Sequence, residues 1–215
     1  MRALLDNDLL HKLALFKLLQ PFVHYLKSSG YSLHALGTFR FRYHLNDPMK
    51  ALKKCYTEDA LELLRTFVSE NAEVPIVAGS PLYGELANIP GIEVGEVQLI
   101  VAAIHHEDAI IYTGDKRFLQ TLKADHRLAT ERQALQGRIV VLEQVLQGLL
   151  VKLAFDDLKA RILPGLKHDT MMRAIFGSAE QSTPDSVAGA VTAYVADAKE
   201  QLAPLLAGSW LLSKP

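Results

Sequence analysis

Apolar residues in this chain follow two spacings, which predict different elements. Short, mostly apolar runs at 2–5, 109–113 and 138–142 predict buried strands of a parallel sheet, and a run at 74–77 predicts another. Apolar residues repeated every three or four positions predict amphipathic helices between the strands. These predicted helices cover 9–19, 22–26, 58–69, 95–103, 116–122 and 143–155.

Residues 38–44 read Thr-Phe-Arg-Phe-Arg-Tyr-His, alternating aromatic and basic side chains. Strict alternation is typical of a half-buried strand. Because the segment lies between helical patterns, a helix is the alternative. Further along, residues 156–176 and 188–206 are predicted to be helical, with a polar loop at 178–185 between them.

The order of these elements indicates an α/β fold in which helices cover both faces of a short parallel sheet, giving three layers. We expect an α/β domain over residues 1–150 and a helical C-terminal extension over 151–215. The extension is expected to pack on this domain or on a second subunit. The apolar helix at 143–155 and the alanine-rich C-terminal region therefore allow a homodimer, or simply cover the sheet.

Composition narrows the class of protein. Hydrophobic residues make up 49% of the chain and charged residues 22%, and the formal net charge is -1. No global field therefore attracts nucleic acid or anionic lipid, and nucleic-acid binding requires a local basic patch. Cys55 is the single cysteine, which excludes an internal disulfide and a thiolate-rich metal site.

No stretch is long and apolar enough to predict a membrane span. The N-terminal apolar run is interrupted by Asp6 and Asp8, and no small-residue cleavage site follows, which argues against a signal peptide. We expect a soluble, cytoplasmic protein that has no membrane partner.

Acidic residues mark the ends of the predicted strands, where parallel-sheet proteins place their chemistry. Asp6 and Asp8 follow the first strand, Asp115 follows the strand at 109–113, and Glu96 opens a helix. Carboxylates are preferred ligands of Mg²⁺, and clustered carboxylates repel one another unless a cation lies between them. The four acids predict a Mg²⁺ or Mn²⁺ site that activates water and neutralises the charge of a phosphodiester transition state.

Each acid also has a structural explanation. Asp6 or Asp8 can cap the first helix, and Asp115 can cap the helix that follows it. Glu96 is favoured near a helix N-terminus by the helix dipole alone. The combined arrangement of strand–Asp, Glu–helix and strand–Thr-x-Asp favours the metal site.

Three stretches that carry these acids resemble PIN-domain proteins. Residues 4–10, Leu-Leu-Asp-Asn-Asp-Leu-Leu, resemble the family's opening strand, and 95–103 resemble its later acidic helix in the variant with Gly-Glu. Residues 113–118, Thr-Gly-Asp-Lys-Arg-Phe, resemble its Thr-x-Asp-x-x-Phe segment. The similarity spans residues 3–145.

This resemblance implies a PIN-like fold and Mg²⁺- or Mn²⁺-dependent ribonuclease activity, with Asp6, Glu96 and Asp115 as the catalytic acids and Asp8 as an accessory metal ligand. Many bacterial members are toxins of toxin–antitoxin pairs, which makes an antitoxin an expected type of partner. Active members usually carry one more glutamate on an intervening helix. The matching region, 36–45, has no carboxylate, so Glu85 or Asp8 substitutes for it, or the site is degenerate.

Two other functions compete with a nuclease. In a catalytically degenerate PIN-like module, Arg40, Arg42 and Lys116 would contact RNA phosphates, or the chain would bind a protein partner. In a haloacid-dehalogenase-like phosphatase, the Asp6-x-Asp8 pair would act with Ser80 and Asp115. Two features oppose the phosphatase hypothesis. A second acid is expected four residues after Asp115, where the chain has Leu119. A lysine is expected between Ser80 and Asp115, but residues 81–114 contain none.

Overall fold

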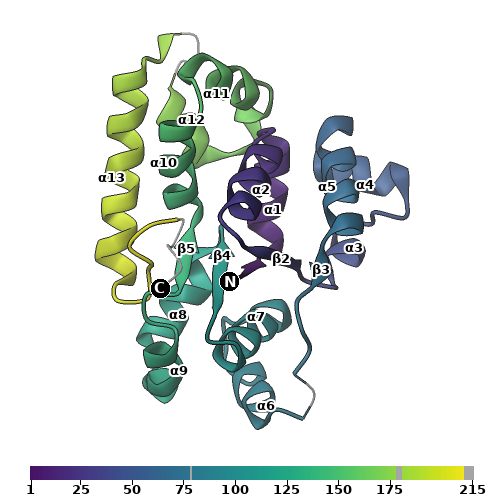
Figure 1. The fold of residues 1–215 in the computed structure, drawn as a ribbon, viewed down its shortest axis with the longest axis vertical. Helices are drawn as coiled ribbons and strands as arrows, with labels where there is room; N and C mark the ends of the chain where they lie inside the picture. The colour runs from purple at the N-terminus through teal and green to yellow at the C-terminus, as the bar shows by residue number, and fades with distance from the viewer. Residues whose placement is uncertain (78, 178–180, 211–215) are drawn as a thin grey trace.

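The computed structural model describes residues 1–77, 79–177 and 181–210. Within these ranges, five parallel strands form one sheet, in the order β3-β2-β1-β4-β5 (Figure 1). The parallel pairing confirms the predicted α/β class. The strands are β1 (Arg2–Leu5), β2 (Ser32–Ala35), β3 (Ala72–Glu73), β4 (Ala109–Thr113) and β5 (Ile139–Val141).

Helices connect consecutive strands and fill the C-terminal third of the chain. The α-helices are α1 (Asn7–Leu15), α2 (Leu19–Ser28), α3 (Phe39–Arg42), α4 (Pro48–Cys55), α5 (Glu58–Glu70), α6 (Pro81–Ala87), α7 (Val94–His105), α8 (Lys116–Ala124), α9 (Ala129–Ala134), α10 (Leu142–Lys152), α11 (Phe155–Ile162), α12 (Thr170–Phe176) and α13 (Pro184–Leu202). Two 3₁₀ helices, η1 (His126–Leu128) and η2 (Leu163–His168), join some of them.

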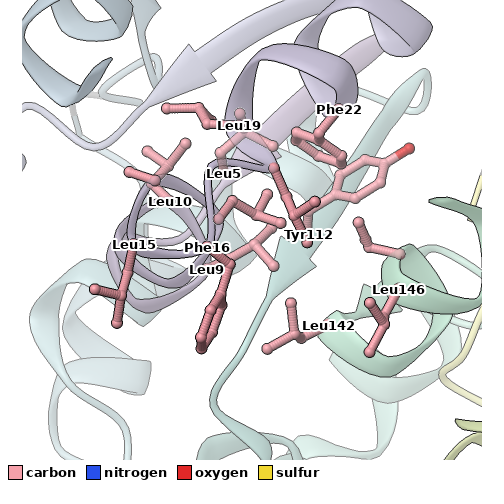
Figure 2. Close-up of a cluster of buried hydrophobic side chains, with 14 of the residues drawn as sticks. Leu5, Leu9, Leu10, Leu15, Phe16, Leu19, Phe22, Tyr112, Leu142 and Leu146 are labelled. Atoms are coloured by element: carbon pink, nitrogen blue, oxygen red, sulfur yellow. The ribbon is translucent and has the colours of Figure 1, made fainter. Parts of the chain in front are cut away.

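The sheet separates two hydrophobic cores, because successive strand side chains point to opposite faces. Leu5 and Tyr112 point into a core formed with α1, α2 and α10, which Figure 2 shows in close-up. Leu4 and Ile111 point into the other core, formed with α7 and α8. All four side chains are fully buried. This packing gives the three layers that the sequence predicts.

Three local predictions need correction. Residues 38–44 do not form a strand: α3 occupies most of the segment, as the helical alternative held. The strand expected at 74–77 is instead the short β3 at Ala72–Glu73. No strand was predicted at β2, because its Ser-Leu-His-Ala sequence has neither an apolar run nor β-branched residues.

The predicted helices at 9–19 and 22–26 correspond to α1 and α2, but the break between them comes earlier than predicted. It contains Lys17, whose backbone is left-handed with φ 53°, and Pro21 belongs to the first turn of α2. Proline is tolerated there because the first helical N–H groups have no partner within the helix.

The C-terminal helices pack directly on the sheet layers. Val187 and Val191 of α13 lie in the same core as Leu146 of α10. Beyond α13, the chain runs beside β5: the Ile139 N–H donates to the Leu205 carbonyl at 3.2 Å, and the Ala207 N–H donates to the Ile139 carbonyl at 2.7 Å. This contact covers the free edge of the sheet. Across the described ranges, no helix combines the length and apolar character needed to cross a membrane.

Candidate active site

The predicted acids lie at the C-terminal ends of the parallel strands. Asp6 directly follows β1, and Asp115 follows β4 after one glycine. Glu96 lies in the first turn of α7, which returns the chain to the start of β4. Because this helix runs back along the sheet, its first turn lies near the end of β4. The charges of Asp6 and Asp115 both act on Glu96, which agrees with this placement.

Asp6 is held in a fixed orientation. Its Oδ1 accepts a hydrogen bond from the Asn7 N–H at 2.7 Å, and its Oδ2 accepts one from the Thr113 hydroxyl at 2.9 Å. The residue is only 7% exposed. Burial raises the pKa of Asp6 to about 6, against the lowering effect of the Thr113 hydrogen bond, and the nearby Asp8 charge adds to the rise.

Glu96 is the second buried carboxylate, with 9% of its surface exposed. Its Oε2 accepts a hydrogen bond from the Glu93 N–H at 2.7 Å and so caps α7, a role that was not predicted from the sequence. Burial raises the pKa of Glu96 to about 7, and the charges of Asp6 and Asp115 reinforce the rise. Among the described residues, no lysine, arginine or histidine forms an ion pair with Asp6 or Glu96, and the charge of Asp6 acts on Glu96.

Asp115 is more exposed and already neutralised. Its Oδ1 accepts a hydrogen bond from the Arg117 N–H at 2.8 Å and so caps α8. The Arg117 guanidinium lies 2.7 Å from the other carboxylate oxygen, and this hydrogen bond lowers the pKa of Asp115. The Asp115 N–H donates to the Thr113 hydroxyl oxygen at 3.0 Å. One threonine hydroxyl therefore links Asp6 and Asp115.

Asp8 lies beside the loop that follows β4. A Cβ added to Gly114 would come 2.5 Å from Asp8 Oδ2, so a side chain at this position would displace the Asp8 carboxylate. The Asp8 carboxylate pairs with Lys12 at 3.0 Å, and the same ammonium lies 3.6 Å from Asp169. Asp8 therefore contributes to the charge of the site while being paired itself.

Glu143 is a further buried acid that was not among the predicted site residues. This carboxylate is 3% exposed, lies in the first turn of α10 just after β5, and forms an ion pair of 3.0 Å with Lys116. The signal was present, because an acid closely follows the apolar run at 138–142. The pair also engages Lys116, which was expected to contact nucleic acid.

The two arginines expected to bind nucleic acid are in different surroundings. Arg42 lies by the acids: its Nη1 is 3.0 Å from Glu93, and the Asp6 charge is among the influences that raise its pKa, after the Glu93 hydrogen bond. Arg40 instead donates to the Val68 carbonyl at 3.1 Å. Phe41, between them, is 76% exposed. Arg42 is therefore the arginine associated with the acids.

The structure also shows where the substitute acid and the residues of the phosphatase hypothesis lie. Glu85, considered as a substitute acid, is exposed on α6. Ser80 precedes α6, and the described residues 74–77 before it do not form a strand, with Ile76 76% exposed. Leu119 is fully buried in the core.

A cavity of about 600 Å³ lies away from the acids, between α2 and α5. Its wall includes Leu19, Val23, Leu63 and Phe67, and none of the four predicted acids lines it. The candidate site therefore lies at the C-terminal ends of the strands and is separate from this cavity.

The donor chemistry of the acids fits a hard divalent cation, since carboxylate oxygens are its preferred ligands and Asp6 and Glu96 are buried without an ion pair among the described residues. In this structure, however, these acidic side chains are not grouped as a metal site. In the ranges that the structure describes, no three His, Cys, Asp or Glu side chains are grouped so as to hold a metal ion. A metal complex that includes Asp8 and Asp115 requires these residues to turn from Lys12 and Arg117.

Comparison of the chain with protein-family models, with curated proteins and with solved structures gave no match. The resemblance to PIN-domain proteins therefore stays a prediction from the sequence, and the function has to be argued from the site itself.

Proposed function

We propose that this chain hydrolyses phosphodiester bonds of RNA at the edge of the sheet where its strands end, using Mg²⁺ or Mn²⁺. Asp6, Glu96 and Asp115 would hold the cation, with Asp8 as an accessory ligand. A divalent cation bound there supplies an activated water and offsets the negative charge of the transition state.

One observation carries this proposal. Asp6 and Glu96 are buried carboxylates whose pKa values are raised to about 6 and about 7, and the described residues pair neither with a cation. Buried charge is costly unless it is paired or coordinates a metal. A site that keeps two such acids together is a functional-site candidate with a physical reason for binding a cation.

The surrounding residues have distinct roles in the proposal. Thr113 orients Asp6 through its hydroxyl. Arg42 supplies positive charge for the phosphate backbone, because its ion pair with Glu93 is exposed and easily exchanged. Arg117 is 86% exposed, so it is free to leave Asp115 and contact phosphate.

A specific observation favours the second candidate, a PIN-like module that binds RNA or a protein such as an antitoxin without cleaving RNA. Asp8 and Asp115 are already paired, with Lys12 at 3.0 Å and with Arg117 at 2.7 Å. If these ion pairs are permanent, Lys12 and Arg117 neutralise the acids in place of a metal ion. The two candidates differ in whether a divalent cation binds.

Calorimetric titration of Mn²⁺ decides between them. We expect wild type to bind Mn²⁺, and Asp6→Asn/Asp115→Asn protein to lose most of that binding. Asp157→Asn is the matched control, because Asp157 is exposed and pairs with Arg161 on α11, outside the acid cluster. Cleavage of a labelled RNA by wild type, abolished by EDTA and by Asp6→Asn, would complete the case. Absence of Mn²⁺ binding to wild type would favour the non-cleaving module.

A further inference from the structure

Four rings near the acids lie in contact, one after another, and we call them the aromatic ladder: Tyr43, His11, Tyr56 and His168. Tyr43 stacks on His11 with ring centroids 5.0 Å apart, and His11 faces Tyr56 at 5.7 Å. Tyr56 stacks on His168 at 4.2 Å, with 12° between the ring planes. The ladder begins at buried Tyr43 and ends at the surface, since Tyr56 is 51% exposed and His168 is exposed.

The ladder lies beside the acidic site. Tyr43 donates a hydrogen bond from its hydroxyl to the carbonyl of Asn7 at 3.4 Å, directly between Asp6 and Asp8 in the chain. Lys12 reaches Asp8 at 3.0 Å and Asp169, the neighbour of His168, at 3.6 Å. The segment that carries the exposed end of the ladder is thus tied to one of the proposed metal ligands.

The backbone at Tyr56 is unusual for its residue type. Tyr56 ends α4 in the left-handed conformation, with φ 67° and ψ -27°. Helix ends of this kind favour glycine, because a Cβ is strained there. A bulky aromatic residue held in such a conformation, with half of its surface in solvent, points to a use other than stability.

The surroundings of the ladder favour a polyanion. Lys53 and Lys54 close to Tyr56, and Lys167 next to His168, are exposed and form no ion pair within the described residues. The buried Nε2 of His11 also has no hydrogen-bond partner among those residues, and buried polar atoms seldom lack one. Exposed aromatic rings flanked by lysines are the combination with which proteins bind single strands.

We propose that Tyr56 and His168 form a base-stacking platform for single-stranded nucleic acid, with the flanking lysines contacting its backbone. Stacking tolerates any base, because every base has a π-face. The platform lies next to the acids, so a bound strand passes the site of cleavage; this last point rests on the proposed function, whereas binding does not.

The test measures binding by fluorescence anisotropy, with short labelled oligouridine and oligothymidine strands in EDTA, so that cleavage is absent. Tyr56→Gly and His168→Ala are expected to raise the dissociation constant about tenfold or more, and Tyr56→Phe to change it by less than about twofold. His24→Ala is the control for His168→Ala, since His24 is an exposed histidine on α2.

Tyr56→Gly also separates binding from folding. Glycine relieves the left-handed backbone, which offsets the loss of the ring contacts of Tyr56 with His11 and His168, so we expect a folded protein by circular dichroism together with weaker binding. Binding of both strands or of RNA alone by wild type, lost in Tyr56→Gly, supports the platform. The platform is wrong when wild type binds neither strand, or when Tyr56→Gly binds as tightly as wild type.

The same assay keeps this inference distinct from the proposed function. Asp6→Asn protein is expected to retain binding to the platform even though it cannot cleave. Wild type that binds through Tyr56 but cleaves no RNA, with Mn²⁺ present, would leave the platform standing and remove the nuclease proposal.

Discussion

The hydroxyl of Thr113 donates a 2.9 Å hydrogen bond to the carboxylate of Asp6, across 107 positions of the chain. The same hydroxyl oxygen accepts the N–H of Asp115 at 3.0 Å. Because β1 and β4 are neighbours in the sheet, the two strand ends supply one hydrogen-bonded unit. The short motif Thr-x-Asp thus has a physical role: its threonine holds the acid of another strand.

Removing this hydroxyl tests the unit. Thr113→Val keeps the side-chain shape but leaves Asp6 Oδ2 and the Asp115 N–H without their partner. We expect the free energy of unfolding to fall by about 1–3 kcal/mol, measured by urea denaturation. The pKa of Asp6 should rise further, because the hydrogen bond stabilises its charged form. Thr66→Val, at an exposed threonine of α5, should leave stability nearly unchanged; equal losses in both variants would contradict the role of Thr113.

The raised pKa values of Asp6 and Glu96 predict how stability depends on pH without metal. Burial raises them from 3.8 and 4.5 to about 6 and about 7. The folded protein therefore holds these protons more tightly than the unfolded chain does. With respect to these groups, the free energy of unfolding should be greatest below about pH 4 and should fall as the pH rises from there to about 7.

Raising the pKa of Asp6 from 3.8 to about 6 corresponds to ~3 kcal/mol of stability lost at high pH. Urea denaturation in EDTA at pH 5 and pH 8 measures the change in the free energy of unfolding between the two pH values. This change should be smaller in an Asp6→Asn/Glu96→Gln variant than in wild type. Saturating Mg²⁺ at pH 8 should restore stability to wild type. A wild type that is steadily more stable between pH 5 and pH 8 would show that these carboxylates are not buried as described.

Asp115→Asn should separate activity from folding. Asparagine caps helices about as well as aspartate, so the hydrogen bond to the Arg117 N–H is preserved and circular dichroism should be unchanged. The charge available to a cation is lost, so RNA cleavage should fall by at least about 100-fold. Arg117→Ala is the matched variant: it removes the exposed ion pair while keeping the acid, so stability should change by under about 1 kcal/mol.

Replacing glycine by alanine should change the stability of the protein in opposite directions at Gly148 and Gly189. A Cβ on Gly148 of α10 would overlap the indole of Trp210, so Gly148→Ala should destabilise the protein by about 1–3 kcal/mol through overpacking. Gly189 of α13 has open space around it, so Gly189→Ala should stabilise by ~0.5–1 kcal/mol. Trp210 is the single tryptophan, so its fluorescence reports the displacement directly. A stable Gly148→Ala protein with unchanged emission would mean that the C-terminal segment does not pack there.

Much of the fold was predictable because the apolar runs carry it. β1, β4 and β5 are buried on both faces of the sheet, and such strands appear as continuous apolar sequence. β2 was not predictable in this way: Ser32 is exposed and His34 half-buried, so only its pairing with β1 makes it a strand. The α3 segment shows the reverse case, since Phe39 and Tyr43 are buried at helical spacing while Phe41 is 76% exposed.

Some features of the candidate site were likewise predictable from the sequence, and others were not. Asp6 and Asp115 were predictable because each follows an apolar run, and their roles as helix caps follow from local rules. The ion pairs that now engage Asp8, Asp115 and Glu143 were not, although the partners Lys12 and Arg117 lie within one helical turn. Local spacing permits such pairs but does not say whether a side chain turns to its neighbour or to the site.

By itself, the sequence determined the α/β class, the three buried parallel strands and the acids at their ends, because burial and capping leave direct traces in the order of residues. The tertiary structure alone decided which side chains meet. It brought Thr113 to Asp6, Lys116 to Glu143 and His168 to Tyr56. Contacts between segments far apart in the chain depend on how strands pair and helices pack, and no local pattern of residues encodes them.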